Sequence, residues 1–200
     1  MRKEVLNLKK CIIFLALLLC SCSAPNKQNK IEKEPQTQGV TRKVTVQEIT
    51  VSEATTNIID EGENRVNNIL LACQKISGIK LSAGEEFSFN KITGRKTEKN
   101  GYKTAPVLVD GEKSYGIGGG VCQVSTTIYM AAKSGGFEIT EHHNHSESVA
   151  YAPEGMDATV VYGVKDFKFR NNSDDDIYIF VWVDGDKVIS KIIKKDSRHF

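Results

Sequence analysis

The sequence predicts an α+β domain in which a largely antiparallel sheet packs against one or two helices. Two observations support this fold class. Many short apolar stretches lie between turn signals, as in strands that are joined by hairpins. Only two stretches, residues 66–76 and 121–133, place apolar residues at helical spacing. About 155 residues follow the polar N-terminal region, which is enough for a single domain with a buried core.

The first expected elements are a strand and a helix. Apolar residues nearly alternate over residues 44–51, which predicts an entry strand. The apolar stripe of residues 66–76 is followed by Gly78, where a helix commonly ends. Cys73 lies on this stripe, so we expect it to be a small buried hydrophobic residue.

Strands and a second helix make up the rest of the domain. The helix over residues 121–133 should stop at Ser134-Gly135-Gly136. The expected strands share alternating or continuous apolar residues: 84–90, a hairpin over 105–116 that turns at Asp110-Gly111, 137–143, 148–152, 158–163, 167–170, 177–183 and 187–193.

The N-terminus has the features of a bacterial lipoprotein export signal. Four basic residues within residues 2–10 precede an apolar run, residues 11–20, which is too short to cross a bilayer as a helix. Leu19-Cys20-Ser21-Cys22 then resembles a lipobox. We expect cleavage before Cys22 and a diacylglycerol thioether on it that anchors the protein in the membrane. The alternative is an ordinary signal peptide with incidental cysteines.

Three regions follow from this pattern: a lipoprotein signal peptide (1–21), the lipidated cysteine with a flexible polar linker (22–43) and the folded domain (44–200). The signal peptide carries four basic residues and one acidic residue, so cleavage lowers the formal net charge from +2 to −1. No basic stripe remains that would predict nucleic-acid binding. The expected location is the extracytoplasmic face of the cell membrane.

Two long blocks, residues 84–129 and 142–160, resemble the VanW family of exported bacterial proteins. The resemblance extends from about residue 55 to about residue 185, which is essentially the whole folded domain. One departure is local, since the family typically has His-Pro-His where this chain has His143-Asn144-His145. The resemblance implies a place in the cell envelope, with the cell wall as a candidate setting, and implies no mechanism.

Cys122 is the candidate nucleophile. It follows Gly118, Gly119 and Gly120 near the expected start of a helix. Unpaired backbone N–H groups and the helix dipole at such a position lower the pKa of a cysteine. The glycines permit the close approach of a substrate, and the amides of residues 118–121 could hold an oxyanion.

Two histidines and a carboxylate could complete a thiol-dependent site. His143 and His145 are candidate general bases, because a strand would point both of them to the same face. Asp157 is a candidate to orient one of them, which gives Cys, His, Asp in chain order. Gly-Val-Cys-Gln at the head of a helix also resembles papain-type and transglutaminase-like enzymes, over a few residues only. This hypothesis describes a cysteine-dependent amidase, peptidase or transpeptidase that acts on peptidoglycan or surface peptides without a cofactor.

Three alternatives remain open. In the first, Cys122 is a core residue and the domain is a non-catalytic envelope module that binds wall polymer or a protein partner. In the second, Cys122 forms a disulfide with Cys73, as in many exported proteins. In the third, Cys122, His143, His145 and a carboxylate bind a metal.

Other polar residues give weaker signals. Gln123, Ser125 and Thr126 could bind a glycan or peptide beside the glycine turn, as could Val121 and the three glycines. Equally, Gln123, Ser125 and Thr126 could bond to their own helix backbone. His142 is expected at the surface.

Overall fold

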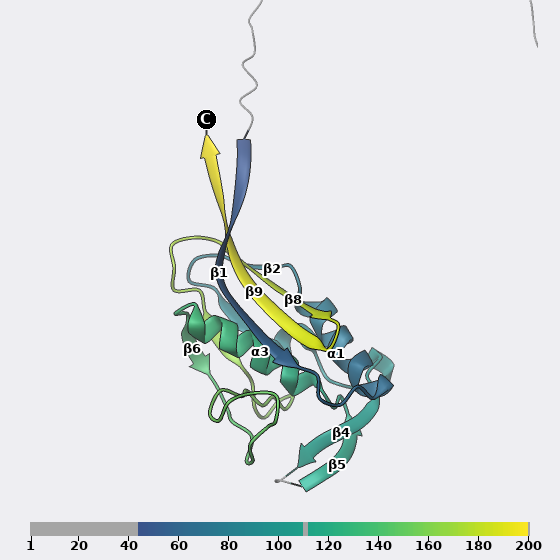
Figure 1. Cartoon of the computed structure of the whole chain (residues 1–200). Helices are drawn as coiled ribbons and strands as arrows, with labels where there is room; N and C mark the ends of the chain where they lie inside the picture. The colour runs from purple at the N-terminus through teal and green to yellow at the C-terminus, as the bar shows by residue number, and fades with distance from the viewer. Residues whose placement is uncertain (1–43, 110–111, 200) are drawn as a thin grey trace, which may run out of the picture. The chain divides into compact units, whose positions relative to one another are not determined.

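The computed structural model describes residues 44–109 and 112–199, and these form one α+β domain with mostly antiparallel sheets (Figure 1). The predicted fold class is therefore confirmed. The expected signal peptide, lipidated Cys22 and linker lie outside the described residues. The helices are α1 (Glu63–Ile76), α2 (Phe89–Thr93), the 3-10 helix η1 (Glu98–Asn100) and α3 (Val121–Ser134). Within the described ranges, none of these helices has the length and apolarity needed to cross a membrane.

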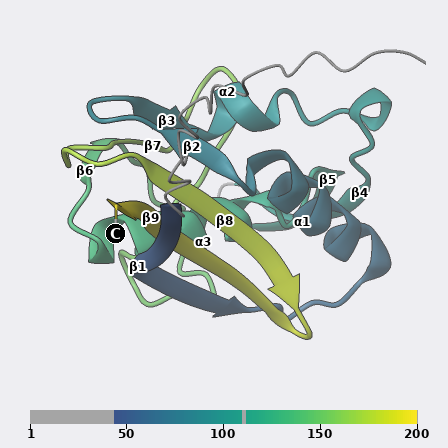
Figure 2. The ribbon, with the colours of Figure 1, turned by 90° about the horizontal axis from the view of Figure 1, so that it is seen from above.

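The largest sheet has four antiparallel strands in the order β1-β9-β8-β2. Its strands are β1 (Val44–Asn57), β2 (Ile79–Leu81), β8 (Ile177–Asp184) and β9 (Lys187–His199). The strands β1 and β9 pair along their whole length, with one register shift between Thr50 and Ser52. Helix α3 runs along one face of the β1–β9 pair, and α1 packs against β8 (Figures 1 and 2).

Two smaller sheets complete the domain. One has the order β3-β7-β6, and the other is the β4–β5 hairpin, which projects from one end of the domain (Figure 1). Their bounds are β3 (Glu86–Ser88), β4 (Thr104–Val109), β5 (Glu112–Ile117), β6 (Glu138–Glu141) and β7 (Lys168–Arg170). The hairpin brings Ile117 to the point where the glycine turn before α3 begins.

Some of the strands expected between residues 137 and 163 are absent from the described structure. β6 ends at Glu141, and residues 148–152 and 158–163 form turns and irregular backbone with one isolated bridge, Val161 to Lys165. The physical reason is local: Ala152 and Met156 donate to Val149 and Pro153 within turns, and side chains of α3 bind the backbone of Ala158, as described below. The prediction of strands over 148–152 and 158–163 was wrong, whereas β6 confirms most of the strand expected over 137–143.

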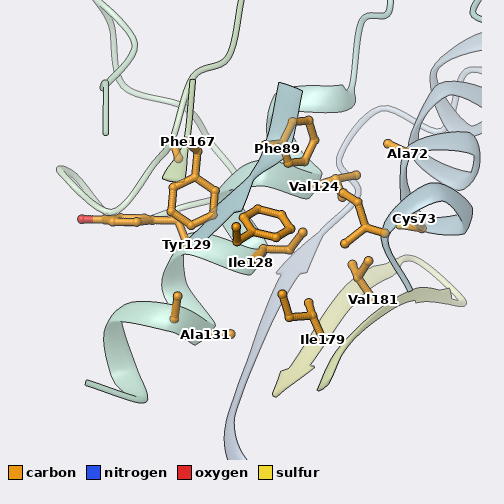
Figure 3. Packing of buried hydrophobic residues seen from close by; sticks show 14 of the residues in the cluster. Ala72, Cys73, Phe89, Val124, Ile128, Tyr129, Ala131, Phe167, Ile179 and Val181 are labelled. Carbon is orange, nitrogen blue, oxygen red and sulfur yellow. The ribbon is translucent and has the colours of Figure 1, made fainter. Parts of the chain in front are cut away.

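The core lies between the two long helices and the sheet. Figure 3 shows Val124 and Ile128 of α3 between Phe89 and the β8 residues Ile179 and Val181. Burying each such side chain contributes about 1.5–3 kcal/mol, which fixes the position of α3 and hence of its first turn. The remaining core includes Cys73, which is buried as the helical stripe predicted.

Candidate active site

The three glycines before α3 are required by the backbone. Gly118 and Gly120 have φ angles of 92° and 102°, where a side chain would be strained. A Cβ on Gly119 would lie 2.3 Å from the carbonyl oxygen of Pro106 in β4. The turn therefore packs directly on β4, at a distance that only glycine allows.

A buried asparagine holds this turn in place. Asn68, on α1, is fully buried and donates from Nδ2 to the carbonyl oxygens of Lys103 and Gly119, each at 2.9 Å. Its Oδ1 accepts the backbone N–H of Lys103 at 2.7 Å. One side chain thus joins α1, the start of β4 and the glycine turn. Asn68 could not be predicted from the sequence, since nothing in its local pattern distinguishes it from a surface helix residue.

Cys122 is the second residue of α3, so its thiol lies at the helix N-terminus as predicted. It is half-buried, and its Sγ lies 3.7 Å from both Thr159 Oγ1 and the carbonyl oxygen of Val160. Both Cys73 and Cys122 are free thiols. The disulfide alternative was therefore wrong. The physical reason is that Cys73 is buried in the core as an apolar helix residue.

Two of the four expected oxyanion amides, those of Gly118 and Val121, are already bonded. The N–H of Gly118 donates to the carbonyl oxygen of Lys103 at 3.0 Å, and that of Val121 donates to Gly118 at 3.1 Å. These two amides are committed to the turn, which corrects the expectation for them. The N–H of Cys122 has no acceptor among the residues that the structure describes. It points from the first turn of a helix, where such donors are free for a ligand.

His145 and Asp157 form a close, largely buried pair. Nδ1 of His145 donates to Oδ2 of Asp157 at 2.6 Å, and the two side chains are 10% and 9% exposed. The same oxygen accepts the backbone N–H of His145 at 2.7 Å. Asn144 donates from Nδ2 to the other carboxylate oxygen at 2.8 Å. Asn144 thus supplies a donor that a proline at this position would lack.

The imidazole of His145 also interacts with the Cys122 thiol, so the thiol, the imidazole and the Asp157 carboxylate shift one another's pKa values. Burial raises the pKa of Cys122, but hydrogen bonding and charge from His145, with smaller contributions from Val160 and Thr159, bring it below its ordinary value. Burial lowers the pKa of His145, but Cys122 and then Asp157 raise it above its ordinary value. Both directions favour a thiolate paired with an imidazolium.

Asp157 remains ionised beside this pair. Burial alone would raise its pKa, but hydrogen bonds from the His145 backbone, from Asn144 and from the His145 ring lower it. A negative carboxylate on Nδ1 keeps the imidazole oriented, so that its other nitrogen is available to the thiol.

The other two histidines lie elsewhere. His143 donates from Nε2 to Glu141 at 3.0 Å, and Lys168 also binds that carboxylate. The expectation that His143 and His145 share one face was wrong, because β6 ends at Glu141 and the chain after it does not alternate as a strand. His142 is not simply a surface residue, since its ring stacks on Tyr129 with 4.2 Å between centroids.

The hydroxyl-rich run after Cys122 holds the Asp157 segment. Ser125 Oγ donates to the carbonyl oxygen of Ala158 at 2.6 Å, and Thr126 Oγ1 accepts the N–H of Ala158 at 2.9 Å. The N–H of Thr159 donates to the carbonyl oxygen of His143 at 2.8 Å, which joins this segment to the histidine loop. These side chains therefore set the position of Asp157 relative to α3.

This arrangement corrects the expectation that Gln123, Ser125 and Thr126 face a ligand. All three are fully buried. Gln123 accepts from Arg65 Nη2 at 2.9 Å and donates to Thr56 Oγ1 and the Asn57 carbonyl oxygen. Their polar groups are already satisfied within the domain, and a buried polar group needs such partners.

The metal alternative is not supported by the positions of the described side chains. Within the described residues, no three His, Cys, Asp or Glu side chains form a group that could hold a metal ion. His143 is bonded to Glu141, so Cys122, His143 and His145 do not converge.

A pocket of about 250 Å³ adjoins the histidine–aspartate pair. His145, Asp157 and Asn144 form part of its wall, and most of the remaining wall comes from the loop of residues 146–155. The pair therefore borders an open hollow on the protein surface and is not enclosed in the apolar core.

The fold and the site together define a single-domain α+β protein in which a cysteine at the start of a helix is electrostatically coupled to a largely buried histidine–aspartate pair. The chain belongs to the VanW family, since the family model described as "VanW like protein" matches residues 64–193. This confirms the family that the two sequence blocks indicated.

Two curated relatives are similar to the chain. YoaR of Bacillus subtilis (strain 168), described as an uncharacterized protein, is 43% identical over 117 residues, or 58% of this chain and 39% of YoaR. The vancomycin B-type resistance protein VanW of Enterococcus faecalis (strain ATCC 700802 / V583) is 29% identical over 135 residues, or 65% of this chain and 49% of that protein. The chain thus spans less than half the length of either relative. No solved structure matches it.

Proposed function

We propose that this domain is a thiol-dependent enzyme that acts on amide bonds outside the cytoplasm, anchored to the membrane through a lipid on Cys22. The observation that supports it most is the arrangement of Cys122, His145 and Asp157. A free thiol at a helix N-terminus interacts with an imidazole whose Nδ1 donates to a buried carboxylate. Nucleophile, base and orienting group in this order are the usual requirements of nucleophilic catalysis.

The first half of the reaction is acyl transfer to the enzyme. The Cys122 thiolate attacks the amide carbonyl carbon and forms a C–S bond, while the carbonyl oxygen becomes an oxyanion. The free N–H of Cys122, in the first turn of α3, stabilises that charge. The His145 imidazolium then gives its proton to the amide nitrogen, the C–N bond breaks, and the amine leaves a thioester on Cys122.

The second half regenerates the thiolate. Neutral His145 removes a proton from water or from an acceptor amine, which attacks the thioester carbonyl. The C–S bond breaks, and Cys122 leaves as the thiolate beside the imidazolium. Water gives a hydrolase, and an amine gives a transpeptidase. Asp157 keeps its charge throughout and stabilises the imidazolium in each half.

The substrate class we propose is a peptide of the cell envelope, either a peptidoglycan stem peptide or a surface peptide. The lipoprotein-like N-terminus supports this setting, since it would hold the domain within reach of the wall. The name of the Enterococcus relative associates that protein with vancomycin resistance, and we assign no resistance role to this chain.

A direct test is to trap the thioester. The protein is incubated with peptidoglycan fragments, and the Cys122 peptide is analysed by mass for an acyl adduct, alongside amine release. We expect an adduct and product with the unmodified chain and with His143→Ala, and neither with Cys122→Ala. Product formation that persists in Cys122→Ala would refute the proposal. Fragments that bind tightly without any adduct or product would favour the non-catalytic envelope module.

A further inference from the structure

A lysine lies over the glycine turn that presents Cys122. Lys96 follows α2, and its aliphatic stem packs on Gly118, where a Cβ would lie 3.0 Å from both Cβ and Cγ of the lysine. Its Nζ donates to Asn90, whose Nδ2 donates to the carbonyl oxygen of Val161, the residue after the one whose carbonyl lies beside the Cys122 thiol. Charge on Cys122 in turn raises the pKa of Lys96. The lysine is half-buried, so this interaction is less screened than at an open surface.

Neutral groups hold the ammonium. Nζ of Lys96 donates to Asn90 Oδ1 at 2.9 Å and to Thr93 Oγ1 at 3.0 Å, and it lies 5.3 Å from the ring centroid of Phe89. An ammonium has three N–H donors, so one donor remains. Among the described residues, no carboxylate lies within ion-pair distance of it.

The charged groups that face Lys96 do not neutralise it at close range. Asp166 and Cys122 favour its charge, and Lys75 opposes it. Both carboxylate oxygens of Asp166 are already bonded, to Ser88 Oγ and to the backbone N–H groups of Asn90 and Phe167. Burial lowers the pKa of Lys96 to about 8. A half-buried cation without an anionic partner is costly, and a bound anion would relieve that cost.

We propose that Lys96 is a specificity-determining residue, whose ammonium binds a carboxylate of the substrate close to the carbonyl that Cys122 attacks. The inference rests on the proposed thiol chemistry and narrows the substrate class to acidic peptides. The carboxylate is either a chain terminus or an acidic side chain next to the scissile amide. A lysine suits this task as a compact point charge on a flexible stem.

The test compares two alkylating reagents of similar size. Iodoacetamide is neutral and iodoacetate carries a carboxylate, and in each case the thiolate displaces iodide and forms a C–S bond. The full chain in detergent is labelled at pH 7, and the rate is read by mass on the Cys122 peptide. We expect the iodoacetate-to-iodoacetamide ratio to exceed that of glutathione by at least about fivefold, as for a partly buried charge pair.

The matched variants are Lys96→Met and Lys99→Met, the second an exposed lysine in η1. Lys96→Met should bring the ratio back to that of glutathione, and Lys99→Met should leave it high. In the unmodified chain, the ratio should also fall as the pH rises through about 8, because Lys96 then loses its proton. This pH series tests the same point even if Lys96→Met does not fold.

The outcomes separate the inference from the proposed function. If Cys122 in the unmodified chain shows the same iodoacetate-to-iodoacetamide ratio as glutathione, and Lys96→Met does not change it, the role of Lys96 is overturned. The thiol chemistry is unaffected by that result. An equal fall for both reagents in Lys96→Met also overturns it, since the lysine would then act on the thiolate alone. Native Cys122 that reacts with neither reagent overturns both.

Discussion

Oδ2 of Asp157 accepts two hydrogen bonds from His145, one from Nδ1 at 2.6 Å and one from the backbone N–H at 2.7 Å. This fixes both the ring and the chain that carries it. Nδ1 is committed to the carboxylate, so Nε2 is the nitrogen that remains for Cys122. The relationship therefore selects His145 over His143 as the partner of the thiol, a choice that the sequence left open.

Asp157→Asn should weaken the thiolate while keeping the side-chain shape. The lost negative charge lowers the pKa of His145, and a less cationic imidazole raises the pKa of Cys122. We expect the alkylation rate of Cys122 at pH 6 to fall about tenfold, which corresponds to a shift of one pKa unit. The exposed Asp174→Asn is the matched control and should change nothing. An unchanged rate in Asp157→Asn would remove Asp157 from the site.

Thr126→Val should loosen the segment that bears Asp157. The substitution keeps the shape of the side chain but removes the acceptor for the buried N–H of Ala158. An unsatisfied buried donor costs about 1–3 kcal/mol. We expect a loss of that size in the free energy of unfolding, measured with urea. Thr140→Val, which breaks an exposed bond to Glu86, should cost less than about 0.5 kcal/mol. Equal losses would contradict the structural role of Thr126.

Glu141 should contribute to stability in acid. A hydrogen bond from Lys168, with further bonds from the Asp166 N–H and from His143, holds the pKa of Glu141 at about 2. Because the folded pKa lies below the unfolded value of about 4.3, the contribution is present above that value and is lost as the pH falls towards 2. The group is partly exposed, so the effect should be below about 1 kcal/mol and should weaken with salt.

The measurement for Glu141 is the free energy of unfolding between pH 5 and pH 2. Glu141→Gln should show a flatter dependence on pH than the unmodified chain over this window. Glu138→Gln, on the exposed end of the same strand, should follow the unmodified chain. A curve for Glu141→Gln that is as steep as the unmodified curve would contradict the assignment.

Periodicity predicted the fold class and both long helices, because their apolar stripes are a direct consequence of burial on one face. It also placed Cys122 at a helix start. The same method failed over residues 148–163, where turn bonds such as Ala152 to Val149, together with Ser125 and Thr126 on Ala158, take the place of pairing with neighbouring strands. Apolar alternation contains no information about such bonds.

Side chains that act over long sequence separations were also beyond prediction. Asn68 lies 51 residues from Gly119, whose carbonyl it binds, and Lys96 precedes Cys122 by more than twenty residues. Each looks like an ordinary polar surface residue until the chain has folded. The catalytic candidates were easier to find, since cysteine, histidine and aspartate are chemically distinctive, although the sequence did not separate His143 from His145.

The most direct test of the thiol site is the alkylation of Cys122 by iodoacetamide from pH 5 to pH 9, with His145→Ala and His143→Ala as a matched pair. The predicted result is fast labelling well below the ordinary thiol pKa of about 8.5, lost in His145→Ala and retained in His143→Ala. Labelling of Cys122 only after denaturation, or equal rates in both variants, would contradict the account and leave the glycine turn with a purely structural role.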